Sequence, residues 1–170
     1  MLEKFVPELI VNNFKEITLA QLSALNCQVL LVDLDNTLVA HDDAHPNHDV
    51  HFFLDKLRDA KIKVILISNN KQSRVDVFCA DLRAPGYGLA YKPFKFKYKK
   101  IIKEYNLDKD TIVCLGDQIL TDVLGAHRMN LKVIWTKPLV NYDSKRTSFS
   151  RFLEKRILKA LSKKGLISDV

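Results

Sequence analysis

Four apolar runs recur along the chain, near residues 29, 64, 112 and 132, and each segment between them is long enough to hold a helix. Such alternation is typical of parallel strands joined by right-handed crossovers. The runs are unbroken, as expected for strands that are covered on both faces of a sheet. The pattern predicts an α/β fold built as a three-layer, doubly wound, mostly parallel sheet of Rossmann-like type.

The apolar run at residues 29–32 ends in two aspartates, Asp33 and Asp35. On an extended backbone, positions two apart point to the same side, so two carboxylates are expected together at the end of a strand. Taken alone, the pair could equally cap a strand and start a turn.

Other apolar stretches end in polar residues too. Ser68-Asn69-Asn70 follows residues 63–67, Lys92-Pro93 follows Leu89-Ala90-Tyr91, and Gly116-Asp117, with Asp122 five residues further on, follows residues 111–115. Ligands of open α/β sheets bind beyond the carboxyl ends of the strands, where all these signatures are expected. The four together therefore favour a binding site over a set of turns.

In chain order, Asp-x-Asp-x-Thr, Ser-Asn, Lys-Pro and Gly-Asp-x-x-x-x-Asp resemble the four motifs of the haloacid dehalogenase-like (HAD) phosphatase superfamily. Residues 5–160 resemble the YqeG-type family of subfamily IIIA, which is similar to mitochondrial phosphatidylglycerophosphate phosphatases. This narrower resemblance is carried by Asp-Leu-Asp-Asn-Thr-Leu-Val, Ile-Ser-Asn-Asn and Gly-Asp-Gln-x-Leu-Thr-Asp-Val-Leu-Gly.

The resemblance implies a phosphomonoester hydrolase that works through an aspartyl-phosphate. Asp33 is expected to attack phosphorus and carry the phosphoryl group. Asp35 is expected to protonate the leaving alkoxide and then to deprotonate the water that cleaves the intermediate. Thr37 and Asn36 are expected to shape the loop rather than to act in the chemistry.

A carboxylate that approaches a phosphate requires a cation between them, and oxygen ligands with a phosphate substrate favour Mg²⁺. The resemblance implies that the ligands are Asp33, the backbone carbonyl of Asp35, and Asp117. Asp122 is expected to orient Asp117 or a metal-bound water.

Three further residues are expected to bind the phosphoryl oxygens. Ser68 and the backbone amide of Asn69 would donate hydrogen bonds to them, and Lys92 would offset the charge that develops there. A cation at Lys92 would also favour the ionised form of Asp33.

A chain of 170 residues with 47% hydrophobic content fits a single phosphatase domain over residues 1–170. Residues 1–25 are expected to form a helical extension, and residues 145–170 a basic amphipathic helix. The gaps at residues 38–61 and 70–91 are too short for an inserted cap domain. We therefore expect a capless enzyme with an open mouth that suits a bulky or membrane-embedded phosphorylated substrate.

Positive charge is concentrated in two segments of a chain whose formal net charge is +7. Residues 137–170 hold nine basic and three acidic residues, and residues 92–103 hold six lysines, three aromatics and no acid. Peripheral contact with an anionic membrane fits this composition, and nucleic acid fits it less well. Solvated helix faces are the plainer alternative, and oligomeric state is not indicated.

Cys27, Cys79 and Cys114 are odd in number and are expected to be free, buried thiols. With no secretory signal and no membrane-spanning run, the chain is expected in the cytoplasm, with peripheral contact at the inner face of the membrane left open. Some residues of the cluster His41, Asp42, Asp43, His45, His48 and His51 are expected to contact substrate, and the cluster is not expected to form a dedicated metal site.

Phosphatidylglycerophosphate is the substrate that the family resemblance implies. A phosphatase of nucleotides or sugar phosphates uses the same chemistry and stays open. So does a regulatory module that keeps the site and binds RNA or protein through its basic surface.

Overall fold

The protein, described by a computed structural model over residues 2–140 and 148–168, contains a six-stranded sheet in which every pairing is parallel. The strand order is β1-β6-β5-β2-β3-β4. The strands are β1 (Leu9–Val11), β2 (Val29–Val32), β3 (Lys63–Ile67), β4 (Gly86–Tyr87), β5 (Ile112–Gly116) and β6 (Lys132–Thr136). The predicted doubly wound α/β fold is confirmed.

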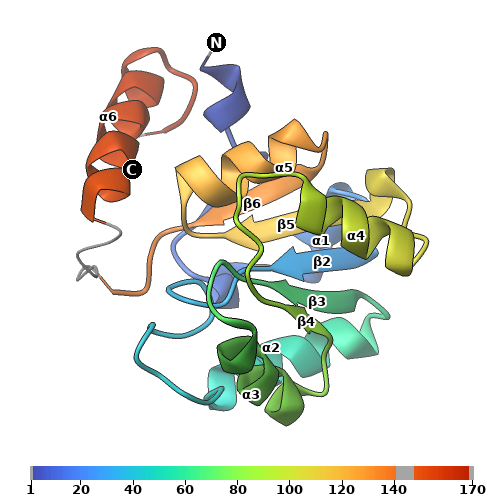
Figure 1. The fold of residues 1–170 in the computed structure, drawn as a ribbon. Helices are drawn as coiled ribbons and strands as arrows, with labels where there is room; N and C mark the ends of the chain where they lie inside the picture. The colour runs from blue at the N-terminus through green and yellow to red at the C-terminus, as the bar shows by residue number, and fades with distance from the viewer. Residues whose placement is uncertain (1, 141–147, 169–170) are drawn as a thin grey trace.

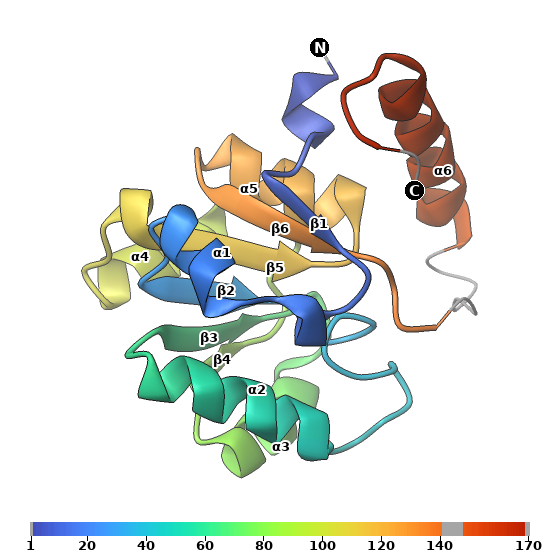
Figure 2. The same ribbon diagram turned by 180° about the vertical axis from the view of Figure 1, so that it is seen from behind.

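Helices cover both faces of this sheet. They are α1 (Leu19–Ala24), α2 (His48–Asp59), α3 (Gln72–Leu82), α4 (Phe96–Glu104), α5 (Leu124–Arg128) and α6 (Ser148–Lys163). Short 3-10 turns lie at Glu3–Phe5, Phe14–Glu16 and Lys109–Thr111, and a π-helical turn lies at Ile119–Val123. Helices α4 and α5 lie in front of the sheet in Figure 1, and α1 and α2 lie in front of it in the reverse view of Figure 2.

Alternate side chains of the strands supply two separate cores. Leu30 and Val32 point to the side that is packed by α1, α2 and α3. Leu31, one residue between them, points to the opposite side, which is packed by α4 and α5. Because both faces are buried, all four residues of β2 are apolar, and this explains the unbroken runs in the sequence.

The four apolar runs near residues 29, 64, 112 and 132 correspond to β2, β3, β5 and β6. The stretch Leu89-Ala90-Tyr91, however, is not a strand: Leu89 and Tyr91 have φ angles of 47° and 50°, which no strand permits. The strand of this segment is the two-residue β4 just before it, and it pairs with β3.

The prediction of a helical extension over residues 1–25 is wrong at residues 9–11. These residues form the edge strand β1, which pairs in parallel with β6, and Leu9 lies opposite Ile134. Glu8 fixes this position, because its carboxylate accepts a hydrogen bond of 2.6 Å from the backbone amide of Val133. The apolar residues of the N-terminal segment thus complete the sheet instead of forming an amphipathic helix.

Helix α6 lies within the basic amphipathic helix predicted over residues 145–170 but ends at Lys163, so residues 164–168 are not helical; residues 145–147 and 169–170 lie outside the described part of the chain. Leu161 is fully buried, and Ile157 and Leu158 pack against the core beside α5. Glu154 is buried and accepts a hydrogen bond of 3.0 Å from the amide of Leu120. The apolar side of α6 is therefore packed on the domain.

No additional domain interrupts residues 33–95, which the structure describes throughout. The segment from residue 38 to residue 61 is a loop followed by α2, and residues 70–91 hold α3, β4 and short connections. The site at the carboxyl ends of the strands is therefore uncapped by inserted structure. None of the helices in the described residues is long and apolar enough to cross a membrane.

The three cysteines are buried and free, as predicted. Burial raises the pKa of Cys27 and of Cys79 to about 12, so both are inert thiols at neutral pH.

The contact between Glu8 and His127 predicts a pH-dependent contribution to stability. His127 Nε2 lies 3.3 Å from Glu8 Oε1, and this hydrogen bond raises the pKa of His127 above 6.5. Burial raises the pKa of Glu8, but the hydrogen bonds from His127 and Val133 outweigh it and bring the pKa below 4.5. Glu8 and His127 of the folded protein are both charged between pH 4.5 and pH 6.5, the ordinary pKa values of the two side chains. The contribution of this pair declines as pH rises through the pKa of folded His127.

A double-mutant cycle with Glu8→Gln and His127→Asn should therefore give a coupling of about 0.5–1 kcal/mol near pH 6, which decreases toward pH 8.5. Chemical denaturation of the four proteins at both pH values measures it. A coupling that is equal at the two pH values would contradict the charged pair.

Candidate active site

Four of the predicted residues meet at the carboxyl end of the sheet, where the strand order reverses. Asp33 directly follows β2 and Asp117 directly follows β5, and these two strands are neighbours. From β2 the chain first builds outward through β3 and β4, and then returns to β5 on the other side of β2. Such a switch point leaves a crevice between the loops of two adjacent strands, and ligands bind there.

Lys92 ties this crevice together from the loop after β4. Its ammonium Nζ lies 2.6 Å from Asp33 Oδ1, 2.6 Å from Asp122 Oδ1 and 2.9 Å from the carbonyl oxygen of Ile67. All three donor protons thus have an acceptor, and the side chain is only 2% exposed. A buried ammonium is tolerated only with such complete pairing.

Three buried carboxylates form a cluster here, and two of them, Asp33 and Asp122, bond to this ammonium. Asp33, Asp117 and Asp122 are all buried, and each offers an oxygen that lies within 4.8 Å of the others. Among the described residues it is the one cluster of acidic, histidine or cysteine side chains with this geometry. With all three acids ionised, the cluster carries a net charge of −2, which matches a divalent cation.

The pKa directions agree with an excess of negative charge. Burial raises the pKa of Asp33 and Lys92 lowers it, while Asp122 and Asp117 raise it again, so that it stands above its ordinary value. Burial alone would lower the pKa of Lys92, but Asp122 and Asp33 outweigh it and raise that pKa. Burial is the largest cause of the raised pKa of Asp33, and the neighbouring acids add to it; since three acids face one ammonium, a second source of positive charge fits the site.

Local backbone geometry brings Asp122 back toward Lys92. A π-helical turn at Ile119–Val123 follows Asp117, and such turns occur often at functional sites. Asp122 Oδ2 accepts a hydrogen bond of 3.0 Å from the amide of Gln118, which leaves Oδ1 for Lys92. Asp122 lies in the same buried cluster as Asp117, and its direct partner in the structure is Lys92.

Thr37 has more than the loop-shaping role expected of it. Its hydroxyl Oγ1 lies 3.3 Å from Asp33 Oδ2 and 3.2 Å from Asp117 Oδ1, so it bridges the two loops. On the other side, Trp135 of β6 donates a hydrogen bond of 2.8 Å from Nε1 to the backbone carbonyl of Asp117. Both contacts restrain Asp117 in the crevice.

Asp35 lies at the rim, apart from the three buried acids. Its Oδ2 accepts a hydrogen bond of 3.1 Å from Asn70 Nδ2, and its Oδ1 pairs with Arg74 Nη2 at 3.2 Å. The side chain is 20% exposed, so it can reach both a bound substrate and solvent. This position suits a group that exchanges protons with a leaving group and with water.

The loop after β3 faces the loop that carries Lys92. Ser68 is buried, and its Oγ accepts a hydrogen bond of 3.0 Å from the amide of Asn70. The side chain of Asn69 spans the gap to the next loop: Oδ1 accepts from the amide of Lys92 at 2.6 Å, and Nδ2 donates to the Lys92 carbonyl at 3.2 Å. The side chain of Asn69 therefore holds the backbone of Lys92 in place. The phosphate contact expected of Asn69 involves a different group, its backbone amide.

Arg74 was not among the predicted site residues. Arg74 is the third residue of α3. Its guanidinium carbon Cζ also lies 5.7 Å from the ring centre of Phe78. Its Nε is buried and has no hydrogen-bond partner among the described residues. An arginine on an amphipathic helix carries no sequence signal for such a role, because its reach to Asp35 depends on how α3 packs.

The histidines between His41 and His51 form no joint site in the structure. His41 pairs with Asp42 at 2.9 Å, and His45 pairs with Asp81 on α3 at 2.7 Å. These are separate contacts of exposed side chains.

Comparisons with known proteins agree with this geometry. The sequence profile of the HAD-hydrolase-like family matches residues 90–141. Over 168 residues, the chain is 36% identical to the Probable phosphatase YqeG of Bacillus subtilis (strain 168), which covers 98% of both chains.

Two solved structures share the fold. One is a HAD-superfamily hydrolase of subfamily III A from Legionella pneumophila, with a TM-score of 0.53 and 21% identity. The alignment covers 85% of this chain and 90% of the Legionella chain. The 3-deoxy-D-manno-octulosonate 8-phosphate phosphatase of Moraxella catarrhalis, solved with magnesium, phosphate and KDO, has a TM-score of 0.50 and 15% identity. It covers 84% of this chain and 93% of its own.

The parallel sheet, the order of the motifs and the buried aspartates define a hydrolase of the HAD-like class. Similarity along almost the whole length assigns it further: the chain belongs to the YqeG family of phosphatases.

The close packing of Gly116 against Asp122 can be tested by adding a side chain at position 116. A Cβ added at this last residue of β5 would lie 2.3 Å from Asp122 Cγ, so the carboxylate would have to leave its place beside Lys92. We expect Gly116→Ala to destabilise the protein by about 1–3 kcal/mol and to lower phosphatase activity.

The control is Gly116→Ala combined with Asp122→Gly, since the added Cβ would lie 2.3 Å from Cγ and 2.5 Å from Cβ of Asp122, and glycine removes both atoms. Denaturant unfolding should show a smaller loss for the double variant than the sum of the two single losses. Strict additivity would mean that the new methyl group does not act through Asp122.

Proposed function

We propose that this protein is a Mg²⁺-dependent phosphomonoesterase that works through an aspartyl-phosphate on Asp33. The observation that carries the proposal is the buried group of Asp33, Asp117 and Asp122 around Lys92 at the switch point of the sheet. Three ionised carboxylates and one ammonium carry a net charge of −2, which a divalent cation would balance before the phosphate of a substrate approaches. Membership of a phosphatase family supports the same reaction.

Asp33 is the group placed to attack phosphorus. It stands at the start of the loop after β2, and Lys92 and Thr37 hold its two oxygens in fixed directions. Attack by a carboxylate oxygen forms an acyl phosphate and releases the alcohol of the ester. Lys92 then faces the phosphoryl oxygens and offsets their charge, while the hydroxyl of Ser68 and the amide of Asn69 donate hydrogen bonds to them.

Asp35 is the proton carrier in this proposal. In its acid form it protonates the departing alkoxide, and as a carboxylate it then takes a proton from the water that cleaves the acyl phosphate. Arg74 and Asn70 each hold one of its oxygens, so its direction at the rim is restrained. The Asp35 side chain is 20% exposed and that of Asp33 is 10% exposed, so Asp35 is the more open of the two to a leaving group and to water.

The donor set fits Mg²⁺. Hard carboxylate oxygens of Asp33 and Asp117, with the backbone carbonyl of Asp35, would hold the ion, and Asp122 would steady Asp117 and Lys92. When bound, the ion would neutralise the negative charge shared by Asp33 and the phosphate.

For the substrate we propose phosphatidylglycerophosphate at a membrane surface. The similarity of this family to mitochondrial phosphatidylglycerophosphate phosphatases supports it, as does the lack of inserted structure over the described residues of the site. Phosphate monoesters of nucleotides and sugars are the alternatives. The remaining alternative is a regulatory module that binds RNA or protein, and such a protein would release no phosphate from any ester.

Replacing Asp33 with Asn should lower phosphate release by on the order of 10³-fold or more, because the nucleophile is lost. The assay uses p-nitrophenyl phosphate, phosphatidylglycerophosphate in detergent, nucleotides and sugar phosphates, with near-ultraviolet circular dichroism to confirm the fold. Asp59→Asn, at the exposed last residue of α2, is the matched control. Retained turnover in the Asp33 variant would refute the assignment.

Magnesium should stabilise the wild-type protein against heat through Asp117. Binding to the folded state alone adds about 2.7 kcal/mol when the ion is present at 100 times its dissociation constant. Asp117→Asn should lose most of this increment, whereas Asp81→Asn, on α3, should keep it. Thermal unfolding with Mg²⁺ or with EDTA measures the difference, and an equal increment in all three proteins would place the ion elsewhere.

A further inference from the structure

The loop between β4 and α4 faces two ways. Lys92 turns inward and is only 5% exposed, with its ammonium among the buried aspartates. Tyr91, one residue before it, is 54% exposed, and Phe94, two residues after it, is 58% exposed. The same short segment therefore joins the floor of the candidate active site to the outer surface.

Four exposed apolar side chains gather on this loop and on the first turn of α4. They are Leu89, Tyr91, Phe94 and Phe96, at 41%, 54%, 58% and 51% exposure, and are called the aromatic patch below. The rings of Tyr91 and Phe96 lie 5.9 Å apart, and the amide of Phe94 bonds to the Tyr91 carbonyl at 3.0 Å. Single exposed apolar residues are ordinary, but a contiguous group beside a site marks an interaction surface.

Backbone strain holds part of this patch outward. Leu89 and Tyr91 both adopt positive φ angles, which are uncommon for large side chains. The amide of Leu89 donates to the Asn70 carbonyl at 2.7 Å, and the amide of Ala90 donates to the Ser68 carbonyl at 3.0 Å. These bonds to the loop after β3 keep the strained segment in place, and such strain is concentrated at functional sites.

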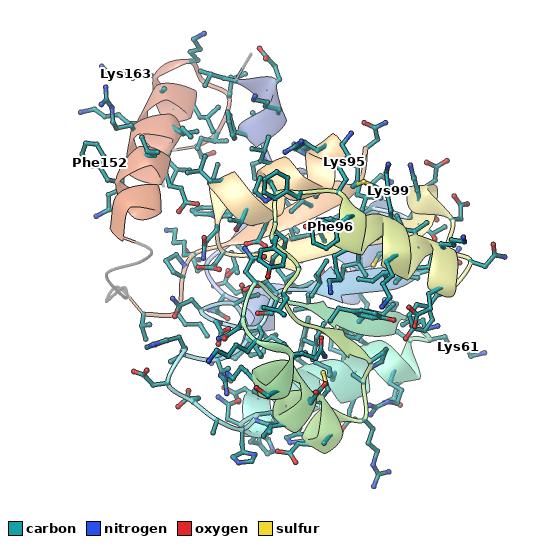
Figure 3. The ribbon with its side chains drawn as sticks, viewed as in Figure 1. Lys61, Lys95, Phe96, Lys99, Phe152 and Lys163 are labelled. Carbon is teal, nitrogen blue, oxygen red and sulfur yellow. The ribbon has the colours of Figure 1, made fainter. Side chains whose placement is uncertain are left out.

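Basic side chains surround the aromatic patch. Lys95, Lys99, Lys100 and Lys103 are exposed, and residues 88–103 contain no acid. Figure 3 shows Lys95, Phe96 and Lys99 together on one side of α4. The guanidinium of Arg128, on α5, lies 5.9 Å from the ring centre of Phe94. Across the described residues, no salt bridge engages Lys95, Lys97 or Lys99.

We propose that the aromatic patch and its basic rim dock this protein onto an anionic lipid bilayer. Aromatic side chains settle at the headgroup level of membranes, and lysines beside them are attracted to anionic lipids. Docking through this loop would turn the mouth of the site toward the bilayer. That consequence rests on the proposed function, whereas the docking itself does not.

Two features favour lipid over nucleic acid. Binding of single strands relies on ring faces that stack with bases along a basic groove. Leu89 offers no ring, and the rings of Tyr91 and Phe96 already contact each other. Insertion into a lipid interface needs only apolar area with positive charge around it.

Helix α6 is a weaker candidate for this contact, although it is amphipathic and basic. Its residues Ile157, Leu158 and Leu161 are packed toward the domain. Phe152 is the large apolar side chain that α6 leaves exposed within its described positions. The apolar area needed for insertion is therefore available on the aromatic patch instead.

Co-sedimentation of the full chain with lipid vesicles tests the proposal. Wild-type protein should sediment with phosphatidylcholine vesicles that contain added phosphatidylglycerol, much less with phosphatidylcholine alone, and less as salt rises. Phe94→Ser with Phe96→Ser should reduce partitioning about 10-fold or more, through lost apolar burial. Lys95→Gln with Lys99→Gln should weaken it by about 10-fold, through lost attraction to anionic lipid.

Matched controls come from exposed residues away from the aromatic patch. Phe52 on α2 is 68% exposed and has Asp55 and Asp59 beside it, so Phe52→Ser should leave partitioning unchanged. Lys61→Gln with Lys109→Gln removes two charges that precede β3 and β5, at the opposite end of the strands. Circular dichroism confirms that each variant is folded.

Several results would overturn the proposal. These are wild-type protein that fails to bind anionic vesicles, equal binding by the Phe94 and Phe96 double variant, and equal binding to uncharged vesicles. Tighter patch-dependent binding of a single-stranded RNA homopolymer would assign the surface to nucleic acid instead.

A separate readout keeps this test apart from that of the proposed function. Hydrolysis of soluble p-nitrophenyl phosphate should be the same in the patch variants as in wild type. If wild-type protein binds anionic vesicles through the aromatic patch but releases no phosphate from any ester, the docking stands and the proposed function falls.

Discussion

The ammonium of Lys92 is the interaction on which the site depends. It reaches from the loop after β4 into the crevice between β2 and β5, and it bonds to Asp33, Asp122 and the carbonyl of Ile67. Each of these partners belongs to a different segment of the chain. Without this cation, three buried carboxylates would face one another with no compensating charge, and burial of unpaired charge is among the most unfavourable arrangements in a protein.

The compensation is incomplete, and this gives the site its chemistry. One ammonium among three acids leaves the pKa of Asp33 above its ordinary value, with burial as the main cause. In the proposed mechanism a divalent cation held by Asp33 and Asp117 would complete the balance and would let an incoming phosphate approach a carboxylate that otherwise repels it. Thr37, the amide of Gln118 and the indole of Trp135 orient the same acids, so little rearrangement is needed when a ligand binds.

The parallel sheet is what allows distant parts of the sequence to meet here. Every strand ends at the same edge, so Asp33, Ser68 and Asp117, each directly after a strand, converge without long loops. Short connections then leave the mouth uncovered by inserted structure. The loop that supplies Lys92 also carries Tyr91 and Phe94 outward, and it is therefore the part of the molecule that links the site to whatever lies against this surface.

Much of this arrangement could be predicted from sequence, for reasons that differ among its parts. β2, β3, β5 and β6 are recognisable because strands that are buried on both faces are unbroken apolar runs. β1 and β4 are not, because strands of three and two residues leave no periodic signal and depend on a neighbour for their existence.

The site residues divide in the same way. Asp33, Lys92, Asp117 and Asp122 can be found because their order along the chain is distinctive. The bridge made by Thr37, and the reach of Arg74 to Asp35, depend on packing across the crevice. Tyr98 is likewise buried although its neighbours in sequence are lysines, because it lies on the side of α4 that faces the core, and composition alone does not reveal which side that is.

In the proposed mechanism, Asp33 itself takes up the phosphoryl group. Acid quench during steady turnover, followed by reduction with borohydride, converts an aspartyl-phosphate to homoserine, and peptide mass spectrometry locates the converted residue. We expect homoserine at position 33, formed only when substrate and Mg²⁺ are both present. Homoserine at another aspartate, or an unmodified Asp33 in protein that is turning over substrate, would contradict it.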